Sequence, residues 1–109
     1  MDWRLRNDGA RLVAMPTGRV DEESWKDFSA HLTSAVREAV AASIPLVIDL
    51  SGLDYMTSKG LRALTLAKNE AKGAIMIRLA APNEAMRRIL TISRYNMLFP
   101  VDDDVDPAN

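Results

Sequence analysis

A continuous apolar run constrains the fold of this chain more than any other segment. Residues 44–50 read Ile-Pro-Leu-Val-Ile-Asp-Leu, so apolar side chains follow one another without alternation after Pro45. A strand of this kind needs cover on both of its faces, which is typical of a sheet of parallel type. We therefore expect residues 46–50 to form a central strand of an α/β domain.

Strand and helix patterns alternate on both sides of this run. Two short, partly alternating segments around Asn7-Asp8-Gly9 predict a hairpin, and apolar residues at helical spacing predict three helices. In chain order we expect strands at 3–6 and 11–15, a helix over about 22–42, the strand 46–50, a helix ending at Gly73, a strand at 74–79 and a helix opened by Pro82. A right-handed crossover between strands 46–50 and 74–79 places the turn 51–58 at the carboxyl edge of the sheet, where sites are usually built.

The helical patterns also predict which side chains face the core. Asp21 is expected to cap the first helix, while Trp25 and Phe28 anchor it in the core. The third helix is expected to bury Ala85, Ile89 and Ile92.

The composition of the chain excludes several classes of protein. Its 109 residues suit a single domain, and fourteen basic against fifteen acidic residues leave no electrostatic signature of nonspecific nucleic-acid binding. No apolar run approaches the roughly 18 residues of a membrane span, and Met1-Asp2-Trp3-Arg4 lacks the regions of a signal peptide. We therefore expect a cytoplasmic protein that does not insert into membranes.

The residue types that many enzymes use are scarce. The chain has no cysteine, and its only histidine, His31, lies on the first predicted helix, off the apolar stripe. This makes thiol catalysis, thiolate metal sites and histidine triads hard to build. Asp49 and Asp54 flank a turn, but without a third acid or a glycine-rich loop nearby they indicate turn capping rather than Mg²⁺ binding or acid–base work. We expect no catalytic residue, no metal and no cofactor.

Two adjacent hydroxyl residues, Thr57 and Ser58, lie where the second helix is expected to begin. The unpaired N–H groups and the positive dipole end of a helix start would stabilise a phosphate on Ser58. The same residues suit a plain helix N-cap, worth roughly 1 kcal/mol, and the residues alone favour that simpler interpretation.

The stretch 49–64 resembles the signature of STAS domains. Its segments Asp49-Leu50-Ser51, Thr57-Ser58-Lys59-Gly60-Leu61 and Arg62-Ala63-Leu64 are similar to the motif of the bacterial anti-sigma factor antagonists. Residues 89–100 are similar to that family's final helix and short terminal strand. The resemblance implies a STAS-like α/β fold over residues 1–109, with a mixed sheet of four or five strands packed with about four helices. Residues from about 102 to 109 would form an acidic tail prone to disorder.

The resemblance also implies a partner-switching regulator. Such a protein binds a GHKL-type serine kinase, often an anti-sigma factor, while its turn serine is free, and is released once that serine is phosphorylated. A PP2C-type phosphatase resets the switch. Carried over to this chain, the phosphoacceptor is Ser58, with Thr57 as its rival because many relatives have Asp there. The expected docking surface comprises Tyr55, Met56, Thr57, Ser58, Lys59, Gly60 and Arg62.

Four of these residues have more than one interpretation. Tyr55 and Met56 either anchor a partner or pack in the core. Gly60 either allows the close approach of a partner or permits tight packing of the helix start on the sheet. Lys59 stands where Ser or Ala is usual, and it could pair with a phosphate on Ser58 or contact an acidic partner.

Two other classes of function remain as alternatives. Some STAS domains are accessory subunits of transporters, including phospholipid-trafficking ABC complexes, and work without phosphorylation. A small nucleotide-binding or hydrolytic enzyme is disfavoured, because the sequence has no glycine-rich phosphate loop and no evident general base.

Overall fold

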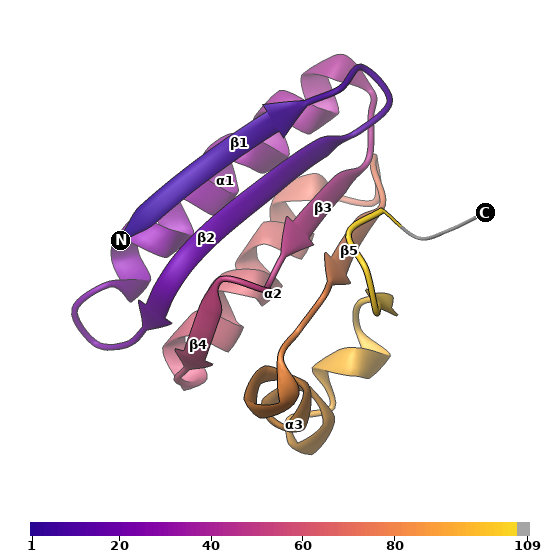
Figure 1. Ribbon diagram of the computed structural model, residues 1–109. Helices are drawn as coiled ribbons and strands as arrows, with labels where there is room; N and C mark the ends of the chain where they lie inside the picture. Colours follow the sequence, from indigo (N-terminus) through magenta and orange to yellow (C-terminus); the bar gives the residue numbers. More distant parts are fainter. Residues whose placement is uncertain (107–109) are drawn as a thin grey trace.

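The computed structural model describes residues 1–106 and shows a mixed sheet with helices packed against it (Figure 1). Its elements are β1 (Asp2–Asn7), β2 (Leu12–Val20), α1 (Trp25–Ala42), β3 (Leu46–Asp49), β4 (Leu53–Met56), α2 (Ser58–Ala71), β5 (Ile77–Ala80), α3 (Glu84–Ile92), the 3₁₀ helix η1 (Tyr95–Met97) and β6 (Val101–Asp102). The predicted fold class is confirmed. The described residues form six strands where four or five were expected, and three α-helices with η1 where about four helices were expected.

The strand β3 lies in the middle of the sheet, as its apolar run predicts. The strand order is β1-β2-β3-β5-β6, with β1 antiparallel to β2 and the following pairs parallel. Leu46 of β3 pairs with Leu12 on one side and Ile77 on the other. The short strand β4 stands outside this order and pairs in parallel with the far end of β2, after a register shift between Gly18 and Arg19.

The main core lies between the sheet and the helices α1 and α2, which lie side by side behind it (Figure 1). It contains Phe28 and Leu32 of α1, Leu46 and Ile48 of β3, and Leu64 of α2, all with no exposed surface. Full burial of one such side chain contributes about 1.5–3 kcal/mol. The apolar residues that recur along the helices and strands thus pack together in one layer between them.

A smaller apolar cluster lies on the opposite face of the sheet and includes a residue that follows β6. Val13, Val47 and Ala80 are buried on this face, and Val105 packs against them. Arg11 donates from Nη1 to the Val105 carbonyl oxygen at 2.6 Å. Part of the predicted acidic tail therefore lies on the sheet, and its residues 107–109 lie outside the described residues.

An ion pair joins β6 to β5. Arg78 donates from Nε and Nη2 to the Asp102 carboxylate at 2.7 and 2.8 Å. The hydrogen bonds to Arg78 lower the pKa of Asp102, and the same bonds raise the pKa of Arg78. The side chain of Asp102 is only 20% exposed, so this pair is better protected from solvent than an ordinary surface ion pair.

The first helix begins later than predicted. The Asp21 carboxylate accepts hydrogen bonds from the N–H groups of Glu23 and Ser24, at 3.0 and 3.1 Å, and holds residues 21–24 in a turn. The helix therefore starts at Trp25, with Ser24 rather than Asp21 at the N-cap position. Phe28 is fully buried, as predicted, whereas Trp25 is only partly buried because it lies at the very start of the helix.

The segment 51–58 is more than the predicted turn, because it contains the strand β4. The strand predicted at 74–79 begins only at Ile77 and runs to Ala80. The helix between them ends in left-handed conformations at both Lys72 and the predicted Gly73.

The third helix buries a different face from the one predicted. Met86 and Leu90 are buried, whereas Ala85 is exposed and Ile92 is 77% exposed. Asn83 explains why the helix is rotated about its axis relative to the prediction. Its side chain joins the start of α3 to the start of β4. It accepts a hydrogen bond from the Met86 N–H and donates from Nδ2 to the Leu53 carbonyl oxygen, both at 2.8 Å. Ile89, also predicted to face inward, is half-buried against the core.

We expect acid to reduce the free energy of unfolding more steeply in the native protein than in an Asp102→Asn variant. The folded-state pKa of Asp102 lies below its unfolded value of about 3.9, so its pairing with Arg78 contributes fully above that pH. The contribution is lost as the pH falls through the folded-state pKa. Urea unfolding at about pH 7 and about pH 3 measures the difference. Asp104→Asn, at an exposed carboxylate nearby, is the control, and a native-like acid response in both variants would contradict this role of Asp102.

Candidate docking and phosphorylation site

The junction between β4 and α2 forms the candidate site, at the carboxyl edge of the sheet (Figure 1). The Thr57 N–H donates to the Val20 carbonyl oxygen at 2.9 Å, which joins the start of α2 to the end of β2. Before β4, the Asp49 carboxylate accepts a hydrogen bond from the Ser51 N–H at 2.9 Å and caps the turn. Asp54, on β4, is exposed. Hydrogen bonds on both sides of β4 therefore fix the position of the helix start.

Ser58 is the exposed first residue of α2. The N–H groups of Gly60 and Leu61 donate to the Thr57 carbonyl oxygen, at 3.0 and 3.2 Å. The N–H groups of Ser58 and Lys59 have no acceptor within residues 1–106. Free N–H groups and the positive end of the helix dipole favour an anion at this position. The site therefore suits a phosphate on Ser58.

Thr57 occupies the N-cap position but does not cap the helix with its side chain. Its backbone is extended, with φ −83° and ψ 176°, yet its hydroxyl makes no hydrogen bond to the helix. The Oγ1 atom is buried and has no partner in the described part of the chain. An acceptor hydroxyl must be reached by the phosphate donor, so the geometry favours Ser58 over its rival Thr57.

The predicted docking surface separates into an exposed and a buried layer. Its exposed and half-buried members are Tyr55, Thr57, Ser58, Lys59 and Arg62. Met56 and Gly60 are buried, which favours the packing interpretation of these two residues. A Cβ atom on Gly60 would overlap Met56 Cγ and approach Val20 Cγ1 to 2.8 Å. Gly60 therefore allows α2 to pack closely on the sheet.

Tyr55 keeps its place on the surface, with 42% of its area exposed. The guanidinium of Arg19, its pairing partner on β2, lies 5.5 Å from the centroid of the tyrosine ring. Such a cation–π contact contributes about 0.5–1 kcal/mol at an exposed site. The contact holds the aromatic side chain of Tyr55 in position at the surface.

A shallow hollow of about 400 Å³ lies beside the helix start and is lined by Trp25, Lys59, Arg62 and Leu66. These four residues are termed the Trp25 groove. Lys59 Nζ lies 2.8 Å from Glu22 Oε2 and 5.3 Å from the centroid of the Trp25 ring. Leu66 is 47% exposed. The groove therefore combines apolar contact area with cations, a composition that suits protein recognition.

Trp25 and Leu66 are candidate contact residues that the sequence analysis missed. Apolar periodicity predicts Trp25 in the core, but its position at the first residue of α1 leaves the ring beside α2. Leu66 lies between the buried Leu64 and Ala67, on the outer side of α2. The sequence signal for Leu66 was its place off the buried stripe of α2, but this signal is weak because single exposed leucines are common.

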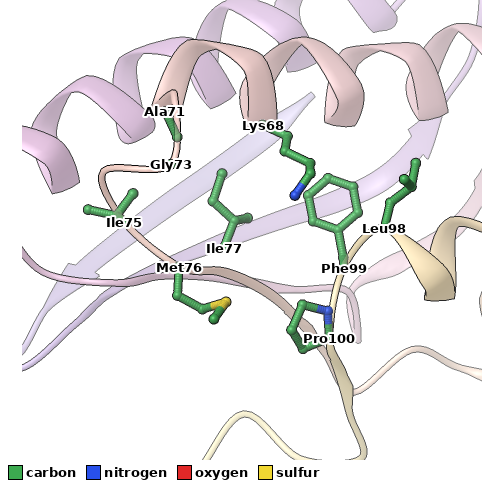
Figure 2. A pocket seen from close by; sticks show the side chains of 9 residues that line it. All are labelled: Lys68, Ala71, Gly73, Ile75, Met76, Ile77, Leu98, Phe99 and Pro100. Atoms are coloured by element: carbon green, nitrogen blue, oxygen red, sulfur yellow. The ribbon is translucent and has the colours of Figure 1, made fainter.

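A second hollow, of about 80 Å³, lies at the other end of α2 (Figure 2). Its lining is apolar except for Lys68, whose ammonium lies 5.8 Å from the centroid of the Phe99 ring. No acid, hydroxyl or imidazole group lines it. Lys68 is therefore the one ionisable side chain among the described residues in this lining.

Other candidate groups lie elsewhere or do not cluster. The His31 ring is partly buried and stacks on Trp3, with the centroids 4.9 Å apart. Within residues 1–106, no three acidic, histidine or cysteine side chains come together as metal ligands. None of the helices in the same residues has the length and apolar character that crossing a bilayer requires.

We expect Gly60→Ala to lower the free energy of unfolding by about 1–3 kcal/mol, because the added methyl group overlaps Met56 and crowds Val20. Thermal or urea unfolding measures the change. Ser58→Ala, in the same helical turn but exposed, is the matched control and should stay within about 0.5 kcal/mol. A Gly60→Ala variant as stable as the native protein would contradict the packing role.

We expect Thr57→Val to leave stability unchanged or raise it by up to about 2 kcal/mol, since it removes a buried hydroxyl that has no partner. Replacing a threonine that caps a helix with its side chain would instead lower stability. Thr65→Val is the matched control, because the Thr65 hydroxyl lies 2.7 Å from the Tyr95 hydroxyl. Its loss should destabilise by about 1 kcal/mol. Destabilisation by Thr57→Val of the same size would mean that the hydroxyl does cap α2.

A family model for the STAS domain matches residues 5–108 of the chain. Among individual proteins, the anti-sigma-F factor antagonist RsfA of Mycobacterium tuberculosis is 26% identical over 111 residues. The match covers 95% of this chain and 81% of RsfA.

Solved structures of similar proteins have the same fold. An anti-sigma factor antagonist from Mycobacterium paratuberculosis has a TM-score of 0.78 and 24% identity, covering 96% of this chain and 87% of its own. The Bacillus anti-sigma factor antagonist SpoIIAA, solved unphosphorylated and phosphorylated, has TM-scores of 0.67 and 0.65 at 18% identity. Those two matches cover 96% and 92% of this chain, and 90% of SpoIIAA in each case. Since the family model spans nearly the whole sequence, the chain belongs to the STAS domain family.

Proposed function

We propose that this protein is a partner-switching regulator of the anti-sigma factor antagonist type. Without phosphate it binds a GHKL-type serine kinase that serves as an anti-sigma factor, and phosphorylation of Ser58 by that kinase releases it. A PP2C-type phosphatase removes the phosphate and restores binding. The protein is then a substrate and ligand, and it catalyses no reaction itself. Because the kinase consumes ATP, the proposal places the switch in the cytoplasm.

The exposure of Ser58 at the first residue of α2 is the observation that carries the proposal. A kinase needs a hydroxyl that it can reach, and the rival hydroxyl of Thr57 is buried. The free N–H groups at the helix start favour the negative charge that phosphorylation adds.

The names of similar proteins support the same role. RsfA is named an anti-sigma-F factor antagonist. SpoIIAA is named an anti-sigma factor antagonist and has both a phosphorylated and an unphosphorylated form. We extend this role to the present chain because its candidate acceptor lies at the start of α2 and beside a groove suited to a partner.

The charges around Ser58 explain how phosphorylation would release a partner. Lys59 and Arg62 are exposed next to apolar surface, so the unphosphorylated face fits an acidic partner surface with an apolar anchor. A phosphoserine adds about −1.5 to −2 charges at neutral pH. In the complex this charge would lose water and meet the partner's carboxylates, and both effects oppose binding.

We expect Ser58→Ala to keep its affinity for the co-purifying kinase and to take up no phosphate. Ser58→Asp, which places a negative charge at the helix start, should bind at least about tenfold more weakly, or about 1.4 kcal/mol. Calorimetry measures the affinities, and incubation with kinase and ATP followed by intact-mass analysis measures the phosphate. Thr57→Val is the control and should still take up one phosphate. Loss of phosphorylation in this control, with normal phosphorylation of Ser58→Ala, would make Thr57 the acceptor.

Analysis of the protein from its native cells tests the whole proposal. Phosphate on Ser58 and a co-purifying GHKL-type kinase would support it. An unmodified protein that co-purifies with a transporter ATPase would contradict it and favour the accessory-subunit alternative.

A further inference from the structure

Two cations follow Ser58 on α2, and they differ in what they already contact. Lys59 Nζ lies 2.8 Å from Glu22 Oε2 and 5.3 Å from the centroid of the Trp25 ring. Arg62 is exposed and forms no ion pair within residues 1–106. Lys59 therefore already has an acidic neighbour, while Arg62 has none in the same residues.

Helix geometry also distinguishes the two cations. Residues four apart lie on one side of a helix, with Cβ atoms about 5–6 Å apart, whereas adjacent residues do not face each other. Helical side chains lean towards the N-terminus, so the long side chain of Arg62 can extend back over Ser58. An acid four residues before a base is the more favourable order for such a pair. Arg62 is therefore better placed than Lys59 to pair with a phosphate on Ser58, and it follows the phosphate in the chain, which is the favourable order.

A third cation, Arg19, approaches the junction from β2 but is directed elsewhere. Its register pairs it with Tyr55, and its guanidinium lies over that ring. Tyr55 precedes Ser58 by three residues and lies on β4 rather than on the helix. Among these three cations, Arg62 alone combines a free guanidinium with a position on the same side of α2 as Ser58.

We propose that Arg62 is the intramolecular partner of a phosphate on Ser58, and that phosphorylation draws its guanidinium away from the Trp25 groove. This inference rests on the proposed phosphorylation of Ser58. A guanidinium can donate two parallel hydrogen bonds to a phosphate, which a lysine ammonium cannot do. Lys59 stays with Glu22, in contrast to the pairing with phosphate considered from the sequence.

The consequence for docking is a double change at one surface. In the unphosphorylated protein Arg62 lines the groove together with Trp25 and Leu66. In the phosphorylated protein the groove loses this cation while Ser58 gains negative charge. Both changes oppose an acidic partner, so a single modification acts on two adjacent parts of the docking surface.

Phosphorus NMR of protein carrying phosphoserine at position 58, installed during translation, tests the inference without any kinase. The second ionisation of a phosphoserine has a pKa of about 6, and a paired cation lowers it because it favours the dianion. We expect Arg62→Gln to raise this pKa by about 0.3 or more. Lys59→Gln, the matched control one residue from the phosphate, should raise it by less than about half as much, because adjacent helical residues do not face each other and Lys59 contacts Glu22. Arg62→Lys should restore part of the lowering.

An unchanged pKa in Arg62→Gln, or an equal rise in Lys59→Gln, would overturn the inference. Both side chains are exposed, so the variants are expected to fold, and circular dichroism checks this. Because the phosphate is installed independently of the kinase, these outcomes concern Arg62 alone. The proposed function fails by a different result, the absence of phosphate on Ser58 in native cells.

Discussion

The pairing of β4 with the end of β2 decides where α2 begins, and most of the candidate site depends on that position. Beyond the register shift at Gly18 and Arg19, Val20 pairs with Met56, and its carbonyl oxygen accepts the Thr57 N–H. The strand ends there, so Ser58 becomes the first helical residue and reaches the surface while Met56 turns inward. The same pairing leaves Leu53 and Met56 buried at the two ends of β4 and Asp54 and Tyr55 exposed between them.

Local sequence patterns predicted those elements that have their own run of apolar residues, helical spacing or turn residues. The unbroken apolar run of β3, the hairpin at Asn7-Asp8-Gly9 and the helical stripes of α1 and α2 carry their own signals. The strand β4 has no such signal, because its burial runs buried, exposed, exposed, buried, and its pairing depends on distant β2. The rotation of α3 is set by a bond from Asn83 to Leu53, thirty residues away, which no local periodicity contains.

Some features of the candidate site could likewise be predicted from local sequence, and others depend on contacts between distant residues. Ser58 could be found from the sequence because a hydroxyl at a helix start is a local feature. The Trp25 groove could not, because it requires the start of α1 to lie against α2. The partner of Lys59 was missed for the same reason, since Glu22 lies far away in the chain and reaches Lys59 only in the folded protein. The burial of Gly60 likewise follows from its contacts with Val20 and Met56.

The two-sided hydrogen bonding of Asn83 connects the site to a helix that is not part of the docking surface. One side of its amide caps α3 at Met86, and the other holds the Leu53 carbonyl oxygen at the start of β4. Opening the first turn of α3 would remove one of the two hydrogen bonds that hold the Asn83 amide in place, so local unfolding of α3 is coupled to the start of β4. Slow exchange of the β4 amide protons would then report on the integrity of α3, and the lifetime of an ordered Ser58 turn depends on a helix later in the chain.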